Sequence, residues 1–330
     1  MRARGGVGRG GHRRGGPRAR VAGVTEPSAG APTAHPRVVA ALGRRWYLEV
    51  SGRGPVVALL HGTGASAGSW RGVAPRLAEH CTVVAVDLPG HGRTEGPADR
   101  RLALAPMADD VAAVLAREGL APAVAVGHSA GVAVALEMAL RRPGALRAIV
   151  GFGAALVPPP WVYDTTFAPV VNRVVTTRAF ARMAALVAGR RAVVDSLLRS
   201  TGSALPPESV AEYRARAGSP AHVRATLVMM AQWDLRGLAA RLDQLTLPVA
   251  LATGDRDAWT PAAALRPLVA RMPNASLAVV PGAGHVLHEE LPAFAADFVL
   301  AAARRAGVLP DEGPVPAGAA PASAAPTSAV

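Results

Sequence analysis

The sequence predicts an α/β fold in which a mostly parallel, doubly wound sheet carries a helical lid insertion. Three observations support this prediction. Short apolar segments rich in β-branched residues alternate with segments of helical periodicity, and these apolar segments have few polar residues on either face. One long stretch, from Leu156 to Leu245, interrupts the alternation with helical patterns and no clear strand. Strands that alternate with helices are typical of βαβ units, and strands that are apolar throughout are typical of parallel sheets covered on both faces.

The expected elements follow in chain order. Two leading strands, Arg37–Leu42 and Trp46–Val50, are expected to pair antiparallel at one edge of the sheet. The apolar runs that we expect to form the parallel strands are Val56–Leu60, Thr82–Val86, Ala123–Val126, Ala148–Phe152, Pro248–Thr253 and Ser276–Val280. Helical periodicity is found near Trp70–Glu79, Leu102–Arg117, Gly131–Leu140, Ala262–Arg271 and Pro292–Arg305.

Composition and periodicity divide the chain into four regions. Residues 1–38 are rich in Gly, Arg and Pro and have no apolar periodicity, so we expect them to form a disordered tail. A second tail of low complexity, made of Pro, Ala, Ser and Gly, is expected over residues 308–330. The folded core then comprises residues 39–155 and 246–307, and the helical lid comprises residues 156–245.

The net charge of +13 does not indicate a nucleic-acid-binding protein. All 36 basic residues are arginine, which is typical of a compositional bias, and residues 1–38 alone contain eight of them against one acid. Over half of the excess charge therefore lies on the expected tail. This tail is either a solvated extension or a segment that contacts anionic lipid or an acidic partner. We expect no binding of nucleic acid by the folded region.

The composition also disfavours a membrane protein and a disulfide-rich protein. A single cysteine excludes a disulfide framework and disfavours a zinc site built on cysteines. No apolar run reaches the roughly 18 residues of a membrane-spanning helix, and the N-terminal region lacks the apolar segment of a secretory signal. We therefore expect a cytoplasmic protein with no membrane span, no metal site and no cofactor.

The strongest motif for chemistry is the G-x-S-x-G segment Gly127–Gly131. It comes directly after an expected strand and directly before an expected helix, which is the setting of a nucleophile elbow. The two glycines allow the backbone to turn sharply, so that the hydroxyl of Ser129 is lifted above the sheet. The N-terminus of the following helix then directs its N–H groups and its positive dipole end at the reacting oxygen. Ser129 is therefore the candidate nucleophile.

A second glycine-rich loop, His61–Gly64, directly follows the expected strand Val56–Leu60. Backbone N–H groups of such a loop stabilise an oxyanion together with the N–H that follows the nucleophile. This assigns the N–H groups of Thr63 and Ala130 as oxyanion donors. Taken alone, the loop is equally consistent with an ordinary strand–helix turn. The later segment Asp87–Gly92 is interpreted as a structural turn.

An acid and a base follow the last two expected strands. Asp257 is preferred over Asp255 as the acid because Asp255 lies in the turn itself and can be used in local hydrogen bonds. His285 lies on a loop flanked by glycines and is the candidate base, whereas His288 begins a helical pattern and is expected at the rim of the substrate pocket. The order Ser129, Asp257, His285 is the Ser–acid–His order found in this kind of architecture.

The lid contains an apolar stripe of Met229, Met230 and Trp233 at helical spacing. Such a stripe is more often core packing than a ligand site, because Met readily fills irregular gaps. The alternative is that the stripe lines the substrate pocket, together with His128 and His288. An apolar, adaptable lid face over the serine would suit a broad, flat molecule such as a tetrapyrrole.

From about Trp46 to Arg305 the chain resembles the α/β-hydrolase superfamily, with its lid between the sixth and seventh strands. It is further similar to the family of magnesium chelatase accessory proteins of bacteriochlorophyll biosynthesis clusters. The lid segment Met229–Leu235 and the loop with two histidines, Gly284–Glu290, narrow the resemblance to this family. The G-x-S-x-G elbow, in contrast, is common to many hydrolases of this superfamily. The segments that carry the resemblance are His61–Arg71, Asp87–Gly92, Gly127–Gly131, Met229–Leu235 and Gly284–Glu290.

The resemblance implies a role in photosynthetic pigment synthesis near the magnesium insertion step, with magnesium chelatase as a partner. Three functions stay open. The first is a serine hydrolase of the carboxylic-ester-hydrolase type, acting on an ester or related acyl bond of a hydrophobic substrate such as a tetrapyrrole. The second is a non-catalytic accessory protein that binds a porphyrin or docks on the chelatase. The third is a generic carboxylesterase unrelated to pigments. A complete triad with two oxyanion loops favours retained catalysis, because a pure binding protein has no need of that combination.

Overall fold

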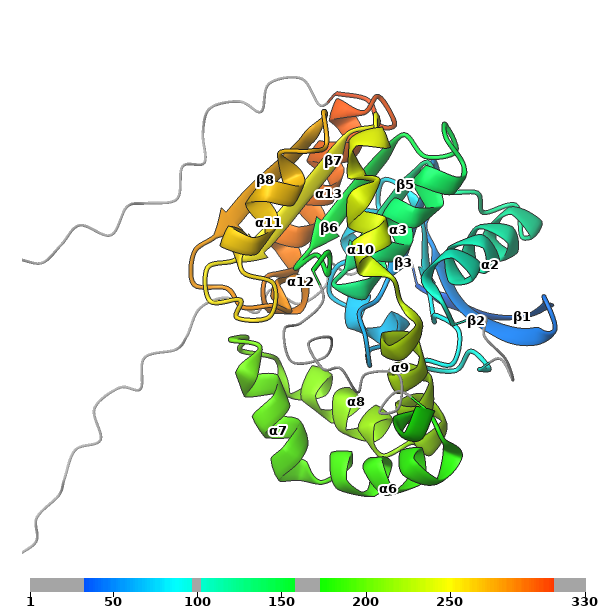
Figure 1. Ribbon diagram of the computed structural model, residues 1–330. Helices are drawn as coiled ribbons and strands as arrows, with labels where there is room; N and C mark the ends of the chain where they lie inside the picture. Colours follow the sequence, from blue (N-terminus) through cyan, green and yellow to red (C-terminus); the bar gives the residue numbers. More distant parts are fainter. Residues whose placement is uncertain (1–32, 97–101, 158–172, 312–330) are drawn as a thin grey trace, which may run out of the picture. The chain divides into compact units, whose positions relative to one another are not determined.

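The computed structural model describes residues 33–96, 102–157 and 173–311, and the structural statements below concern these residues. An eight-stranded sheet forms the core (Figure 1). Its strands are β1 (His35–Ala41), β2 (Arg44–Ser51), β3 (Val56–Leu60), β4 (Thr82–Val86), β5 (Val124–His128), β6 (Ala148–Phe152), β7 (Val249–Gly254) and β8 (Ala275–Val280). They are arranged in the order β1-β2-β4-β3-β5-β6-β7-β8.

The strand directions confirm the predicted fold class. β2 pairs antiparallel with both β1 and β4, and every other neighbouring pair is parallel. The order along the sheet runs outward in both directions from β3, as in a doubly wound sheet. The observed bounds of β3, β4 and β6 coincide with the predicted ones, because each is an apolar run that ends at polar or glycine residues.

Helices connect the parallel strands, mostly where the periodicity placed them. They are α1 (Ala74–Ala78), α2 (Leu104–Arg117), α3 (Ala130–Arg141), α11 (Ala262–Val269), α12 (Leu287–Glu290) and α13 (Pro292–Arg305). The pattern near Trp70–Glu79 is not one helix: a 3-10 turn, η1 (Ala67–Trp70), precedes the short helix α1. Pro75 explains this break, because proline favours the first turn of a new helix. The single turn α12 contains His288, at which the sequence predicted the start of a helical pattern.

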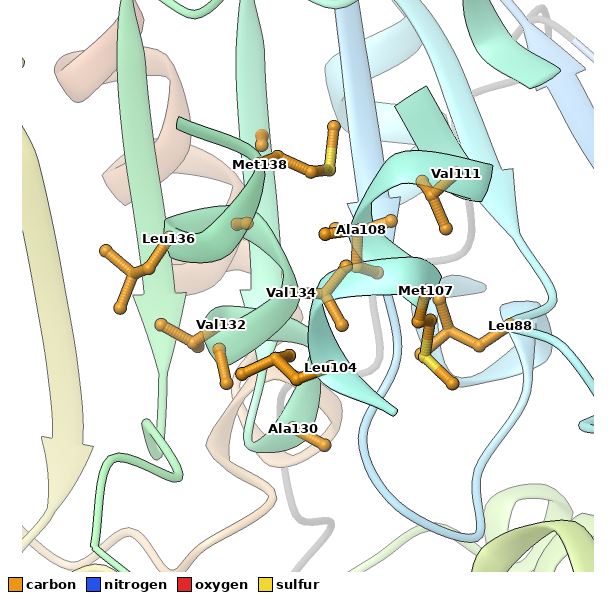
Figure 2. Close-up of a cluster of buried hydrophobic side chains, with 14 of the residues drawn as sticks. Leu88, Leu104, Met107, Ala108, Val111, Ala130, Val132, Val134, Leu136 and Met138 are labelled. Atoms are coloured by element: carbon orange, nitrogen blue, oxygen red, sulfur yellow. The ribbon is translucent and has the colours of Figure 1, made fainter. Parts of the chain in front are cut away.

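Alternating residues of the strands build two hydrophobic cores, one on each face of the sheet. In β3, Ala58 and Leu60 belong to one core, whereas Val57 and Leu59 belong to the other. The first core is closed by α2 and α3, whose side chains interdigitate (Figure 2). The second is closed by α1 and α13. Burial on both faces explains why these strands are apolar throughout. The side chains labelled in Figure 2 are Leu88, Leu104, Met107, Ala108, Val111, Ala130, Val132, Val134, Leu136 and Met138.

The helical insertion lies between β6 and β7, as predicted. Its helices are α6 (Arg178–Ala188), α7 (Arg191–Ser200), α8 (Pro207–Ala217), α9 (Pro220–Gln232) and α10 (Leu235–Ala240), followed by the 3-10 turn η2 (Leu242–Gln244). Helices α6 to α9 lie beyond the carboxyl ends of the parallel strands, whereas α10 returns along the sheet beside α3 (Figure 1). Among the described helices, none is long and apolar enough to cross a membrane.

The ordered region extends beyond the predicted tail boundaries. β1 begins at His35, which pairs with Val50, so residues 35–38 belong to the sheet and not to a disordered tail. At the other end, Leu309 is buried in the core closed by α13. Both segments pair or pack with distant parts of the chain, and local composition does not reveal such contacts. The rest of the two predicted tails, residues 1–32 and 312–330, lies outside the described residues.

A buried ion pair connects the antiparallel edge to α2 and yields a prediction. Arg44 and Asp110 lie 3.1 Å apart with side chains only 3% and 1% exposed. Replacing Asp110 by Ala would leave a buried guanidinium without this partner, so we expect a loss of about 3–5 kcal/mol in the free energy of unfolding, measured by urea denaturation. The neighbouring Asp109, which pairs with Arg141 at the surface, is the matched control. Its replacement by Ala should cost less than about 1 kcal/mol, and equal losses would refute the argument.

Candidate active site

Ser129 lies in the turn between β5 and α3 with a strained backbone. Its φ is 49° and its ψ is −111°, a region that residues other than glycine seldom adopt. Such a conformation costs about 1–3 kcal/mol and persists only where neighbouring structure enforces it. Here the Ser129 N–H donates to the Phe152 carbonyl (2.9 Å), and the Ser129 carbonyl accepts from the N–H of Ala155 (3.2 Å). The motif thus forms a sharp strand-to-helix turn.

The two glycines of the motif are required by close backbone contacts. A Cβ atom on Gly127 would lie 2.3 Å from the Val132 nitrogen, and one on Gly131 would lie 2.0 Å from the Leu60 carbonyl oxygen. Neither contact is tolerable, because both partners are backbone atoms. A side chain at either position would push α3 away from the strands and displace Ser129.

His285 and Asp257 are hydrogen-bonded to each other. His285 Nδ1 lies 2.9 Å from Asp257 Oδ2, and both side chains are buried. Asp257 follows β7 and His285 follows β8, so the carboxyl ends of neighbouring parallel strands bring them together. The other candidate acid, Asp255, is exposed and accepts a hydrogen bond from the N–H of Gly282 (2.8 Å). Local hydrogen bonding thus occupies Asp255, and Asp257 is the carboxylate that reaches the imidazole.

Further donors hold Asp257 in its ionised form. Oδ1 accepts from the N–H groups of Trp259 (2.9 Å) and Thr260 (2.8 Å), and Oδ2 accepts from the hydroxyls of Thr253 (3.1 Å) and Thr260 (2.7 Å). Burial raises the pKa of Asp257, but the hydrogen bonds from His285 and Thr260 outweigh it and lower the pKa below its ordinary value. A carboxylate that stays ionised in a buried position fixes the orientation of His285.

Ser129 and His285 are connected through their immediate neighbours. His128 Nε2 lies 3.1 Å from the backbone carbonyl of His285, and the two imidazole rings are 5.0 Å apart. Gly153 follows Phe152, whose carbonyl accepts the hydrogen bond from the Ser129 N–H. Gly153 has a positive φ of 53°, and a Cβ atom there would lie 2.8 Å from the His285 carbonyl oxygen. The structure therefore brings Ser129, Asp257 and His285 to one place at the carboxyl ends of β5, β7 and β8.

The loop that carries Thr63 lies beside the serine. A Cβ on Gly62 would lie 3.2 Å from Ser129 Cβ, so the loop passes close to the elbow where Ala130 begins α3. His61 fixes the start of this loop: its Nε2 accepts from the N–H of Leu88 (3.0 Å) and its Nδ1 contacts the Gly62 carbonyl (2.8 Å). Burial lowers the pKa of His61 to about 3, so the ring is neutral and carries its proton on Nδ1.

His222, which the sequence did not single out, connects the lid to two loops of the core. It lies on α9, and its Nε2 lies 3.0 Å from the Gly64 carbonyl oxygen. Its Nδ1 accepts from the N–H of Gly92 (3.3 Å), so the proton of the neutral ring is on Nε2 and is donated to Gly64. Burial lowers the pKa of His222 to about 4. A lone histidine within an apolar helix gives no signal of this role.

The loop of His285 is also held by the lid. The His285 N–H donates to the carbonyl of Thr201 (2.8 Å), and the N–H of Val286 donates to the hydroxyl of Ser203 (2.9 Å). The Ser203 hydroxyl in turn donates to the Glu290 carboxylate (2.9 Å), which also accepts from the N–H of Gly284 (2.7 Å). The segment between α7 and α8 thus positions the loop that carries the imidazole.

The residues predicted to line the substrate pocket lie deeper than expected. Met229 (1% exposed) and Trp233 (6% exposed) belong to the hydrophobic core. The Trp233 indole N–H donates to the Leu102 carbonyl (2.8 Å). Met230, in contrast, is half-buried. His288 is fully buried and not at a rim. Packing is therefore the better interpretation of Met229 and Trp233, because α9 leads directly into the helix that packs on α3.

His288 and His128 form a neutral aromatic cluster beside the loop of His285. His288 lies 4.4 Å from the rings of both Trp70 and His128, and neither of its ring nitrogens has a hydrogen-bond partner among the described residues. Burial lowers the pKa of His288 to about 3 and that of His128 well below its ordinary value. Despite the many histidines, the described part of the chain contains no group of three or more His, Cys, Asp or Glu side chains that could hold a metal ion.

The buried neutral histidines predict an acid-sensitive fold. Folding lowers the pKa of such a histidine, so its contribution to stability is complete when the pH is above its pKa in the unfolded chain, about 6.5. The contribution is lost as the pH falls towards its pKa in the folded protein, because the unfolded chain then binds more protons. For His288 this window reaches down to about 3. We expect His288→Phe to flatten the dependence of unfolding free energy on pH below about 6, by up to about 1.4 kcal/mol per pH unit.

Urea denaturation between pH 7 and pH 4.5 measures this slope. The exposed His80 provides a matched control, and His80→Gln should keep the slope of the parent protein. A His288→Phe slope identical to that of the parent protein would show that His288 takes up no proton on unfolding and would contradict its neutral burial.

Comparisons with known proteins agree with the observed fold. Residues 55–292 match the family described as "alpha/beta hydrolase fold". The chain is 36% identical over 247 residues to the "Magnesium-chelatase 30 kDa subunit" of Rhodobacter capsulatus, covering 74% of this chain and 86% of that protein. It is 33% identical over 233 residues to a "Pimeloyl-[acyl-carrier protein] methyl ester esterase" of Methylococcus capsulatus, covering 65% of this chain and 81% of that protein. An alpha/beta hydrolase fold protein from Burkholderia ambifaria superposes with a TM-score of 0.68 at 25% identity, covering 82% of this chain and 100% of that one. The chain belongs to the α/β-hydrolase family.

Proposed function

We propose that the protein is a serine-type hydrolase that cleaves an ester or related acyl bond of a hydrophobic substrate. The observation that carries the proposal is the buried hydrogen bond between His285 and Asp257 beside the strained turn at Ser129. In the reaction, His285 accepts the proton of the Ser129 hydroxyl as the serine attacks the carbonyl carbon, and it then returns this proton to the leaving group. Asp257 holds the imidazole in the correct tautomer and stabilises its protonated form.

Charge on the carbonyl oxygen develops next to the two N–H groups proposed as donors. Ala130 is the first residue of α3, so its N–H lies at the positive end of the helix dipole. Thr63 lies in the loop that His61 and His222 hold from opposite sides. Fixed donors stabilise a tetrahedral oxyanion without reorganisation during the reaction, and each contributes about 2.7–4 kcal/mol in well-studied hydrolases.

We further propose that this hydrolase serves bacteriochlorophyll biosynthesis near the magnesium chelatase step. The support is the similarity to the protein named as a magnesium-chelatase subunit, which extends over most of both chains. In this role the hydrophobic substrate is a tetrapyrrole and the chelatase is a partner.

A second candidate function is a carboxylesterase without a role in pigment synthesis. Several relatives of comparable coverage are named as methyl ester esterases, among them one of Chromobacterium violaceum that is 32% identical over 263 residues. The same three residues would serve this reaction, so the two candidates differ in substrate and not in mechanism.

The mechanism predicts non-additive losses in hydrolysis of a p-nitrophenyl ester. Ser129→Ala and His285→Ala should each lower kcat by about 10³–10⁶, and the double variant should be little worse than either, because the residues act as a unit. Asp257→Asn should lower kcat by about 10⁴, since it disturbs the imidazole tautomer. A fluorophosphonate probe should label the parent protein and not Ser129→Ala.

Asp255→Asn is the matched control for the acid, because Asp255 lies two residues away and bonds the N–H of Gly282 instead of the imidazole. It should retain activity within a few-fold of the parent protein. A larger loss for Asp255→Asn than for Asp257→Asn, or additive losses for the serine and histidine variants, would refute the assignment.

The accessory role predicts a requirement for catalysis in cells. In the host organism, a strain that carries Ser129→Ala at the native locus should accumulate as little bacteriochlorophyll as a deletion strain, with the variant protein present at normal abundance. Normal pigment in the Ser129→Ala strain and loss of pigment in the deletion strain would instead favour a non-catalytic accessory. Normal pigment in both strains would favour the carboxylesterase without a role in pigment synthesis.

A further inference from the structure

A cavity of about 700 Å³ opens between the lid and the core. Its walls come from the loop of residues 90–96, from the first turns of α6 and from the N-terminal half of α9. Ser129, Asp257 and His285 are not among its described lining residues. Its volume falls within the roughly 300–1,000 Å³ that is typical of small-molecule sites.

Four arginines line this cavity: Arg93, Arg178, Arg182 and Arg224. The one carboxylate among the described lining residues is Glu95, which is already bound by the guanidinium of Arg45 at 2.6 Å. The cavity therefore carries a positive charge that its described surroundings do not neutralise. Three of the four arginines, Arg93, Arg178 and Arg182, are exposed, so water screens part of their mutual repulsion, and a bound anion would offset the remainder.

Two of the arginines, Arg93 and Arg224, are held by contacts with their neighbours, and Arg178 and Arg182 share one face of α6. Arg178 and Arg182 are one helical turn apart on α6, so they extend from the same face, and neither forms an ion pair among the described residues. Arg224 uses its Nε to donate to the Thr176 carbonyl (3.2 Å), and its guanidinium forms no ion pair among the described residues. Arg93 lies over the ring of Tyr47 at 4.5 Å from the ring centroid, and its Nη1 donates to the Tyr47 hydroxyl, so both contacts hold its guanidinium plane in place.

The remaining walls are apolar. Leu102, Ala181 and Ala225 contribute to the lining. Trp233 lies behind this wall, because its indole N–H donates to the carbonyl of Leu102. The cavity thus combines several guanidinium groups with a small apolar surface.

We propose that this cavity is a binding site for an amphipathic anion, a small molecule with two or more carboxylate or phosphate groups on an apolar body. Guanidinium groups bind both kinds of anion in a bidentate manner, which single surface charges cannot reproduce. The site goes beyond the proposed hydrolysis, since it involves none of the reacting groups. His222 lines the cavity and also donates to Gly64, so a ligand here contacts the residue that holds the oxyanion loop.

Fluorescence titration of the full-length protein tests the proposal with three probes. Protoporphyrin IX carries two carboxylates on an apolar body, its dimethyl ester is the same body without charge, and coenzyme A carries phosphates. We expect saturable quenching of tryptophan emission, or saturable heat in calorimetry, with at least one of the two anionic probes. The dimethyl ester should bind at least about tenfold more weakly than the free acid, because it lacks the charge-assisted hydrogen bonds.

The variant Arg178→Gln/Arg182→Gln should weaken binding of the anionic probe at least about tenfold while its thermal unfolding midpoint stays within a few degrees of the parent value. Arg266→Gln removes an exposed helical arginine on α11, outside the cavity, and should bind like the parent protein. Ser129→Ala should also bind like the parent protein, so binding is measured independently of hydrolysis.

The anionic probe that binds identifies the source of the anion: protoporphyrin IX indicates carboxylates and coenzyme A indicates phosphates. The proposal is overturned if neither anionic probe binds saturably, if the dimethyl ester binds as tightly as the free acid, or if the double arginine variant binds like the parent protein. None of these results would bear on the triad, which the ester assay and fluorophosphonate labelling test separately.

Discussion

The close approach of α3 to the strand ends is the constraint on which the site depends. Gly131 packs so tightly on the Leu60 carbonyl that a single added carbon would lie 2.0 Å from it. With the helix this close, the chain can leave β5 only through a very sharp turn, and Ser129 takes the positive φ that the turn demands. Burial of α3 between the sheet and α2 offsets the cost of this strain, of order 1–3 kcal/mol (Figure 2). The hydrophobic core thereby holds the strained conformation of Ser129 in place.

The loops around the serine depend on the lid as well as on the sheet. His222 on α9 bonds the loop of Thr63 and the neighbouring turn at Gly92, while Thr201 and Ser203 bond the loop of His285. A rigid displacement of these parts of the lid would break hydrogen bonds to both loops at once. The described lid is therefore a fixed wall of the candidate site, and in the proposed reaction it would act by positioning the two loops.

Local pattern was sufficient for the sheet, for the sharp turn at Ser129 and for the hydrogen bond that joins Asp257 and not Asp255 to His285. Each follows from short-range rules of periodicity, glycine geometry and turn hydrogen bonding. It was insufficient where the deciding contact is remote. His222 meets Gly64, 158 residues away, and nothing in α9 distinguishes it from a core histidine. Met229 and Trp233 have the spacing of a ligand-facing stripe, but the path of the chain into α10 turns them into the core. For such residues, tertiary packing decides the role and the sequence is compatible with either.

The molecule keeps two electrostatic environments apart. Around the serine, the buried rings of His61, His128 and His288 are neutral because burial disfavours their charged forms, so Asp257 supplies the fixed charge next to His285. Arg93 of the core and three arginines of the lid line a cavity that Ser129, Asp257 and His285 do not line. A cation close to His285 would disfavour its protonation during attack, and an anion close to Ser129 would oppose the growing oxyanion. In the two proposals, the anion would therefore bind at a site whose described lining includes none of Ser129, Asp257 and His285, and His222 would be the residue that contacts both the anion and the loop of Thr63.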